Sequence, residues 1–358
     1  MHPGTGTACQ VLPQDSSCTR SRGWGADVHR ALHPLADMMD DRFKDPGFVP
    51  QLWKAVELIH KRHIEATADL LICAHPFLLC AMLRALTSLF MLVYITPTPL
   101  TFVPEADRTW VLAQLAALSE HRRTALLAAS PLYALHAFYQ TGVRVQAVRP
   151  SSLYIAERHQ WRSGTERSHL VYLWIFGRIS KDFVVIVQGF INEAKAAGVP
   201  WMQEPMITFS ELLERQGLIK KGGYVGWDFF AGVRCVVLLP WDLQLTVFPE
   251  LYALGVPLVI PTPEYMVSYS LRCLSEQKMN FWAVRPRFDG GLPGAWAAAF
   301  AAEPWVRDPW GQGYQATLDA EAQLLFWYRA SDFASFGHTL RFASIPELLA
   351  RAAGTPLA

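Results

Sequence analysis

Two acidic side chains, Asp242 and Glu250, stand eight positions apart in an otherwise apolar stretch of this 358-residue chain. Asp242 lies in a polar loop, and Glu250 lies in a short helical pattern that Gly255 closes. Carboxylates so placed could accept hydrogen bonds from ligand hydroxyl groups. Thr246, at the start of the helical pattern, would bring unpaired backbone N–H groups and the positive end of the helix dipole, which favour phosphate. The stretch therefore has groups suited to a ligand with phosphates and hydroxyls.

Basic residues and a histidine extend this set. Arg178 and Lys181, in "GRISKD", follow a predicted strand and could neutralise an anionic group of a ligand. His75 ends the first clear strand and precedes a helix that starts with proline, where a residue of an open α/β sheet could act as a general base. Each residue also has a plain structural interpretation. Glu250 would be an exposed helical acid, Thr246 an N-cap, His75 a packed residue and "RISKD" a solvated turn.

The elements around the acidic pair form one supersecondary unit. Val236–Leu239 reads as a buried strand, Thr246–Leu254 as a helix and Val256–Ile260 as a second buried strand. A strand, helix and strand this close together predict a βαβ unit with a right-handed crossover. Ligands of open α/β sheets bind where strands end and helices begin, which places the acidic pair at such a position.

Two blocks of alternating elements contain this unit and the candidate residues. The first block alternates strands at 69–75, 89–95, 124–130 and 143–149 with helices at 76–86, 105–123 and 131–142. The second block begins near Ser168, with a strand at 169–176, a segment through Ala194 that fits helix or strand, and helices at 208–217, 265–273, 319–328 and 344–353. Strict alternation predicts parallel sheets with helices on both faces, and therefore two α/β domains.

The central motif resembles that of a known enzyme family. "PELYALGVPLVIP" is similar to the E-A-M-A-x-G-x-P segment of retaining GT-B glycosyltransferases. The glutamate, second alanine, glycine and proline of that segment are matched by Glu250, Ala253, Gly255 and Pro257. Asp242 stands where the family's E-x7-E motif has its first glutamate. "GRISKD" resembles the family's G-R-x-x-x-x-K-G segment, with a shorter spacing and no final glycine. The resemblance covers roughly residues 170–262.

The resemblance implies a fold, a ligand and residue roles. The fold would be α/β, with two Rossmann-like doubly wound domains facing a cleft. The donor would be a nucleotide-sugar, with Glu250 on the ribose hydroxyls and Asp242 on the donor sugar. The acceptor, whether glycan, lipid, protein or small molecule, is open, and neither a metal nor a cofactor is expected. Residues 1–68 contain no predicted first strand, although the family has one, so a catalytically inactive relative that binds a glycan or partner is an alternative. A sugar-nucleotide epimerase or phosphorylase on the same fold is another.

Domain boundaries follow from the same patterns. We expect a disordered tail at 1–30, an acceptor-side α/β domain at 31–160 and a nucleotide-sugar-binding α/β domain at 161–317. Helices at 318–358 are expected to pack back on the N-terminal domain.

Composition excludes several classes of protein. The net charge is +1, from 32 basic and 31 acidic residues, which gives no electrostatic footprint for nucleic acid. The N-terminus has no apolar signal-peptide core, so we expect a cytoplasmic protein. The apolar run from Leu70 to Thr96 is long enough to span a bilayer, but His75, Pro76 and Arg84 interrupt it, so we expect a buried strand, helix and strand. Cys73 and Cys235, in predicted strands, are expected to be reduced.

Overall fold

A computed structural model describes much of the chain. The described residues are 48–60, 69–74, 77–95, 103, 107–149, 151–162, 171–174, 181–198, 206–208, 226–239, 243–245, 247–269, 292, 294–295, 301–302 and 318–354. The chain divides into two compact units, and each contains one parallel β-sheet. The first unit comprises Met1–Arg149 and Asp289–Arg307, and the second comprises Pro150–Phe288 and Asp308–Ala358.

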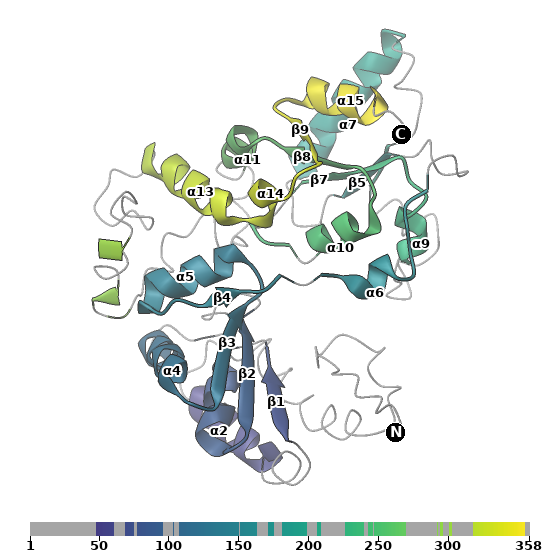
Figure 1. The fold of residues 1–358 in the computed structure, drawn as a ribbon. Coiled ribbons are helices and arrows are strands. Elements are labelled where there is room, and N and C mark those ends of the chain that lie inside the picture. Colours follow the sequence, from purple (N-terminus) through teal and green to yellow (C-terminus); the bar gives the residue numbers. More distant parts are fainter. Residues whose placement is uncertain are drawn as a thin grey trace. The chain divides into compact units, whose positions relative to one another are not determined.

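The first unit contains a four-stranded sheet with its strands in chain order (Figure 1). Its strands are β1 (Leu70–Cys73), β2 (Phe90–Ile95), β3 (Thr124–Ala128) and β4 (Gln146–Ala147). Its helices are α2 (Phe48–Ile59), α3 (Phe77–Leu86), α4 (Arg108–Glu120) and α5 (Pro131–Thr141). Every strand pair is parallel, which confirms the α/β class and the alternating pattern of the first block.

Local sequence signals set the ends of α5. Ser130 caps its first turn, where the Ser130 Oγ accepts a hydrogen bond from the Tyr133 N–H at 3.3 Å, and Pro131 occupies the first helical position. Gly142 ends the helix at a φ of 75°, a left-handed conformation that glycine adopts without strain, and its N–H donates to the Phe138 carbonyl at 2.7 Å. The predicted closure of this helix at Gly142 is confirmed.

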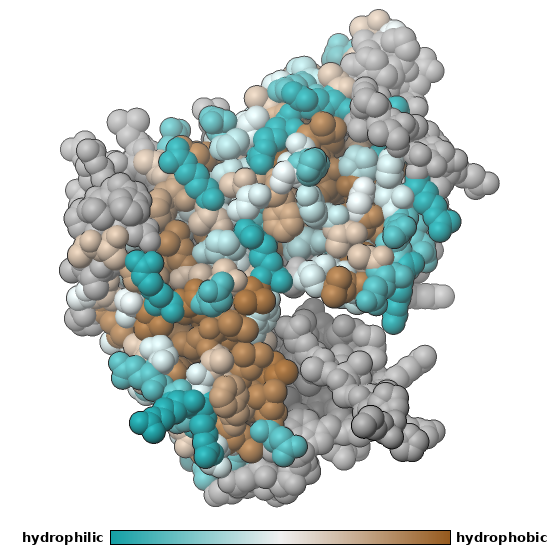
Figure 2. All heavy atoms as spheres, viewed as in Figure 1, coloured by the Kyte–Doolittle hydropathy of each residue, from teal (hydrophilic) through white to brown (hydrophobic). Residues whose placement is uncertain are grey.

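The described helices of the first unit pack on one face of its sheet. Each contacts the next in chain order, α2 with α3, α3 with α4 and α4 with α5, as expected when right-handed crossovers join strands in sequential order. On the opposite face, Leu70, Ile72 and Phe90 are 48%, 51% and 45% exposed, and Figure 2 shows apolar side chains gathered over β1 to β3. The sequence predicted helices on both faces, whereas the described helices of this unit cover one.

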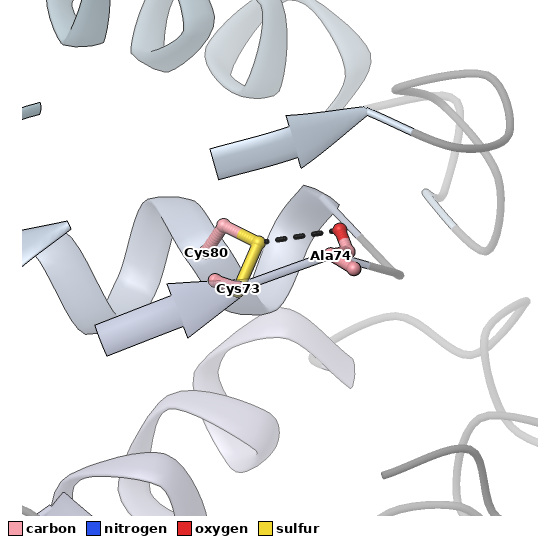
Figure 3. Close-up of a disulfide and its surroundings, with 3 residues drawn as sticks. All are labelled: Cys73, Ala74 and Cys80. Carbon is pink, nitrogen blue, oxygen red and sulfur yellow. Dashed lines mark hydrogen bonds between the residues drawn. A yellow bond between two sulfur atoms is a disulfide. The ribbon is translucent and has the colours of Figure 1, made fainter. Parts of the chain in front are cut away.

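Cys73 and Cys80 form a disulfide, so the expectation that Cys73 is reduced was wrong (Figure 3). Cys73 ends β1 and Cys80 lies in α3, and their Cα atoms are 5.6 Å apart, within the range a disulfide spans. Both residues are buried. Cys235 agrees with its prediction, since its buried thiol contacts the Ala352 carbonyl oxygen at 3.9 Å.

The apolar run from Leu70 onward forms β1, α3 and β2, as the sequence predicted. Across the described ranges, we find no helix with the length and apolar character needed to span a bilayer.

The second unit contains a five-stranded parallel sheet in the order β6-β5-β7-β8-β9. Its strands are β5 (Val171–Trp174), β6 (Met206–Thr208), β7 (Cys235–Leu238), β8 (Leu258–Pro261) and β9 (Leu340–Phe342). Its helices are α6 (Leu153–Ala156), α7 (Lys181–Ala196), α9 (Trp227–Phe230), α10 (Val247–Leu254), α11 (Pro263–Tyr269), α13 (Leu318–Ala330), α14 (Asp332–Ser335) and α15 (Ile345–Gly354). The ambiguous segment through Ala194 is therefore helical.

The predicted βαβ unit is confirmed as β7, α10 and β8. The two strands are parallel and buried on both faces, which explains their continuous apolar sequence. Gly255 ends α10 at a φ of 78°. The loop before α10 therefore leaves the carboxyl end of a central strand.

The order of the second sheet reverses at β5. From β5 the chain crosses to β6 on one side, and the later strands β7, β8 and β9 lie on the other side. Right-handed crossovers in opposite directions place α7 and α10 on opposite faces. The contacts agree, because α15 contacts α7, whereas α9 and α14 contact α10. This unit is doubly wound, with a topological switch point between β5 and β7.

The C-terminal segment belongs to the second unit, which includes residues 308–358; there β9 pairs with β8, and α15 packs on β8 and β9. That the helices at 318–358 pack back on the N-terminal domain stays a prediction. Residues 289–307 belong to the first unit, and the Leu292 N–H donates to the Gln140 carbonyl at 2.8 Å. β9 is only three residues long, too short for its apolar pattern to be recognised in the sequence.

Candidate functional site

The candidate residues of the second unit flank its topological switch point. Arg178 lies in the connection from β5 to α7, and Asp242 and Thr246 lie in the connection from β7 to α10. These two connections leave neighbouring parallel strands at the same edge of the sheet and lead to helices on opposite faces. Such an edge is where open α/β sheets bind ligands.

The structure describes these residues unequally. Arg178, Asp242, Thr246 and His75 lie outside the described residues, so their predicted roles stay predictions. Lys181 begins α7, and its side chain also lies outside the described part. Glu250 is the predicted site residue whose side-chain surroundings are known.

Glu250 lies in the first turn of α10 and is half-buried. The Tyr154 hydroxyl donates a hydrogen bond to the Glu250 Oε1. Burial raises the pKa of the Glu250 carboxyl above its usual value, and the hydrogen bond from Tyr154 acts in the opposite direction. Glu250 is therefore a partly desolvated acid with a specific partner, not the exposed helical acid of the plain interpretation.

Tyr154 reaches Glu250 because a short segment, Ser152–Arg162, is fastened along α10. We call this segment the strap. α6, within the strap, contacts α10. Farther along, the Trp161 N–H donates to the Leu254 carbonyl at 2.9 Å and its indole Nε1 donates to the Val233 carbonyl at 2.8 Å. These bonds tie the strap to the C-terminal end of α10 and to the turn before β7.

A second set of bonds fixes the end of the strap. The Arg162 N–H donates to the Ala231 carbonyl at 3.0 Å, and the His159 Nδ1 is hydrogen-bonded to the Asp228 Oδ1 at 2.8 Å. Sequence reasoning missed Tyr154 and the strap, because 96 positions separate Tyr154 from Glu250 and no motif links them.

The first turn of α10 offers fewer anion-binding groups than the sequence suggested. The Phe248 N–H already donates to the Leu245 carbonyl at 3.1 Å, and Pro249 has no N–H. This helix end can contribute to phosphate binding but is a poorer donor set than a standard helix N-terminus.

Polar and aromatic contacts hold α10 from the side of the C-terminal helices. The Gln244 Nε2, just before α10, donates to the Asp332 Oδ2, and Asp332 is buried at the start of α14. Phe248 packs edge-on against Phe333 with ring centroids 4.7 Å apart, and Tyr252 packs against Phe336 at 4.6 Å. The loop and helix that carry Glu250 are therefore supported by α14 as well as by the strap.

Hydrogen bonds from one arginine hold α14 in position. Arg341, on β9, donates to the Tyr328 hydroxyl at 2.7 Å and to the Phe333 carbonyl at 2.6 Å. Burial raises the pKa of the Tyr328 phenol, and the charge of Arg341 opposes that shift. The network links β9, α13 and α14, and it fixes the helix that packs on α10.

Among the residues with described positions, we find no group of three or more His, Cys, Asp or Glu side chains that could hold a metal ion.

The chain matches no protein-family model and no curated protein at a significant level. The motif around Glu250 and the position of that residue in the fold are the features of this chain that bear on its function.

Proposed function

We propose that the protein is a glycosyltransferase of the GT-B type, which transfers a sugar from a nucleotide-sugar donor to an acceptor. The observation that carries the proposal is the position of Glu250. It is half-buried, bonded to Tyr154 and located on the first turn of α10, beside the switch point of a doubly wound parallel sheet. The proposal includes two Rossmann-like domains that face each other across a cleft.

The proposed donor site is centred on Glu250. Its carboxylate accepts hydrogen bonds from ribose hydroxyls, and Asp242 accepts from hydroxyls of the donor sugar. Arg178 and Lys181, with the positive end of the α10 dipole, neutralise the diphosphate.

In the proposed reaction, the bond between the anomeric carbon and the phosphate oxygen breaks, and the diphosphate leaves with the electron pair. The acceptor oxygen bonds to the anomeric carbon and loses its proton; if the transfer inverts the configuration, a base takes this proton, and His75 of the first unit is the candidate.

Nucleotide binding tests the proposal directly. UDP or GDP at millimolar concentration should raise the melting temperature, since a ligand stabilises the folded state by RT ln(1 + [L]/Kd). Glu250→Ala should abolish the shift. Glu264→Ala is the matched control, because Glu264 is an exposed acid in the first turn of α11. The absence of a shift with every nucleoside diphosphate tested would refute the donor site.

A second function, nucleotide or glycan binding without transfer, is favoured by one observation. Phe248 and Pro249 remove two N–H donors from the first turn of α10, which weakens the stabilisation available to a leaving diphosphate. An assay with radiolabelled nucleotide-sugars separates the two functions. Released or transferred sugar supports the transferase, whereas binding without either product supports the inactive relative.

A further inference from the structure

The segment that leads into α10 carries a polar side chain between two buried leucines. Leu243 and Leu245 are 1% and 5% exposed, and Gln244 lies between them. The Gln244 Nε2 donates to the Oδ2 of Asp332, a residue that is itself 1% exposed. The Leu245 carbonyl accepts from the Phe248 N–H at 3.1 Å. The bond to Asp332 therefore holds a segment that runs directly into the first turn of α10.

This polar pair joins the segment to α14 at a cost in stability. The Gln244 Oε1 is buried, and we find no hydrogen-bond partner for it among the residues that the structure describes. Turning the amide round would place this oxygen against the carboxylate of Asp332, so the charge fixes the orientation of the amide. A buried acceptor without a partner destabilises the folded state, and two apolar side chains would avoid that loss. The pair therefore contributes a defined geometry more than stability.

We propose that Asp332 is a positioning residue for nucleotide binding at Glu250. Through Gln244 it fixes the entry into α10, and thereby the place of the Glu250 carboxylate at the edge of the sheet. This inference rests on the proposed function and extends it to α14, which lies outside the motif around Glu250. In this role Asp332 touches no ligand and acts only through the bond that it accepts.

The backbone on both sides of Asp332 is itself held in place. Arg341, on β9, donates to the carbonyl of Phe333 at 2.6 Å, directly after Asp332. Ser331, directly before it, is buried, and its Oγ donates to the carbonyl of Tyr328 in α13 at 2.6 Å. The acceptor for Gln244 is therefore fixed by β9 and α13. A site positioned before the ligand arrives loses less conformational entropy on binding.

Titration calorimetry of the full chain provides the test, with whichever of UDP and GDP gives the larger thermal shift. Gln244→Glu places a second carboxylate against Asp332, and the two groups repel each other. This variant should bind the nucleotide at least about tenfold more weakly, the effect of one lost hydrogen bond. Without nucleotide, hydrogen exchange at residues 247–254 should become faster. Gln244→Met removes the donor without adding a charge, and it should change both quantities in the same direction.

A reciprocal substitution and two controls complete the design. When Gln244→Glu is combined with Asp332→Asn, the new amide donates to the new carboxylate, so affinity and hydrogen exchange should return close to those of the unaltered protein. Leu348→Ala tests the effect of lost stability alone, because Leu348 is buried in α15, which packs on β8 and β9. It should lower the melting temperature without changing the affinity. Gln188→Glu, at an exposed glutamine of α7, should change neither.

Three results would overturn the inference. If Gln244→Glu and Gln244→Met bind the nucleotide as the unaltered protein does, Asp332 has no positioning role and the donor site stands. If the combined substitution does not restore the affinity, or if Leu348→Ala loses as much, the bond between Gln244 and Asp332 serves stability alone. If the unaltered protein binds no nucleoside diphosphate, the proposed function fails and the positioning role fails with it.

Discussion

His136 should make the stability of the first unit depend strongly on pH. It lies in α5 with its side chain fully buried, and burial lowers its pKa from 6.5 to about 3. Above pH 6.5 the residue is neutral in both the folded and the unfolded chain, and it imposes no proton-linked penalty. Below pH 6.5 the unfolded chain binds a proton that the folded chain does not, so the free energy of unfolding falls until the pH reaches about 3.

The magnitude follows from the two pKa values. At pH 5 the unfolded histidine is about 1.5 pH units below its pKa, while the folded residue is still neutral. At about 1.4 kcal/mol per unit, the loss between pH 8 and pH 5 is about 2 kcal/mol. A loss of this size is a large part of the stability of an ordinary domain.

Urea unfolding of the unaltered protein and of His136→Gln, followed by circular dichroism at pH 8, 6.5 and 5, measures this effect. Hydrogen-exchange mass spectrometry of α5 peptides assigns the transition to the first unit. Between pH 8 and pH 5, the free energy of unfolding of His136→Gln should fall by about 2 kcal/mol less than that of the unaltered protein. His121→Gln, at an exposed histidine, is the control and should follow the unaltered protein. If the free energy of unfolding falls equally with acidification in the unaltered protein and in His136→Gln, the reasoning is refuted.

Two further predictions test the first unit. Met91→Ala, on the helix-covered face of β2, should lower the free energy of unfolding by about 3 kcal/mol, whereas Ile72→Ala, on the exposed face of β1, should cost less than about 1 kcal/mol. Equal losses in urea unfolding would contradict the one-sided covering of the sheet. Reduction of the Cys73–Cys80 disulfide should destabilise the unit by about 2 kcal/mol, because the bond closes a short loop. Thermal unfolding with and without dithiothreitol measures this loss, and Cys80→Ser should be insensitive to the reductant.

Most elements could be predicted because their signals are local. Ser130, Pro131 and Gly142 mark both ends of α5 from positions at its two ends, and continuous apolar runs identify β7 and β8 as buried parallel strands. The α/β class then follows from the alternation of helices and strands. The position of Glu250 in the first turn of a helix after a buried strand could be predicted for the same reason.

The features that sequence reasoning missed depend on contacts between distant residues. The Tyr154–Glu250 bond joins positions 96 apart, and Gln244 bonds Asp332 across 88 positions. β9 becomes a strand because β8 offers it an edge, not because its three residues have a strong pattern. The Cys73–Cys80 pair required the angle between a strand and the following helix, which spacing alone does not give.

The support around α10 is what favours a binding role for Glu250 over an incidental one. The helix is held on one side by the strap and on another by the aromatic contacts of Phe248 and Tyr252 with α14. A solvated surface acid requires no such support, since its side chain gains little from a fixed orientation. A carboxylate that must meet two ligand hydroxyls does require it, because small displacements lengthen both hydrogen bonds. The rigid placement of a partly desolvated acid at the switch point is therefore the feature of this fold that nucleotide binding would use.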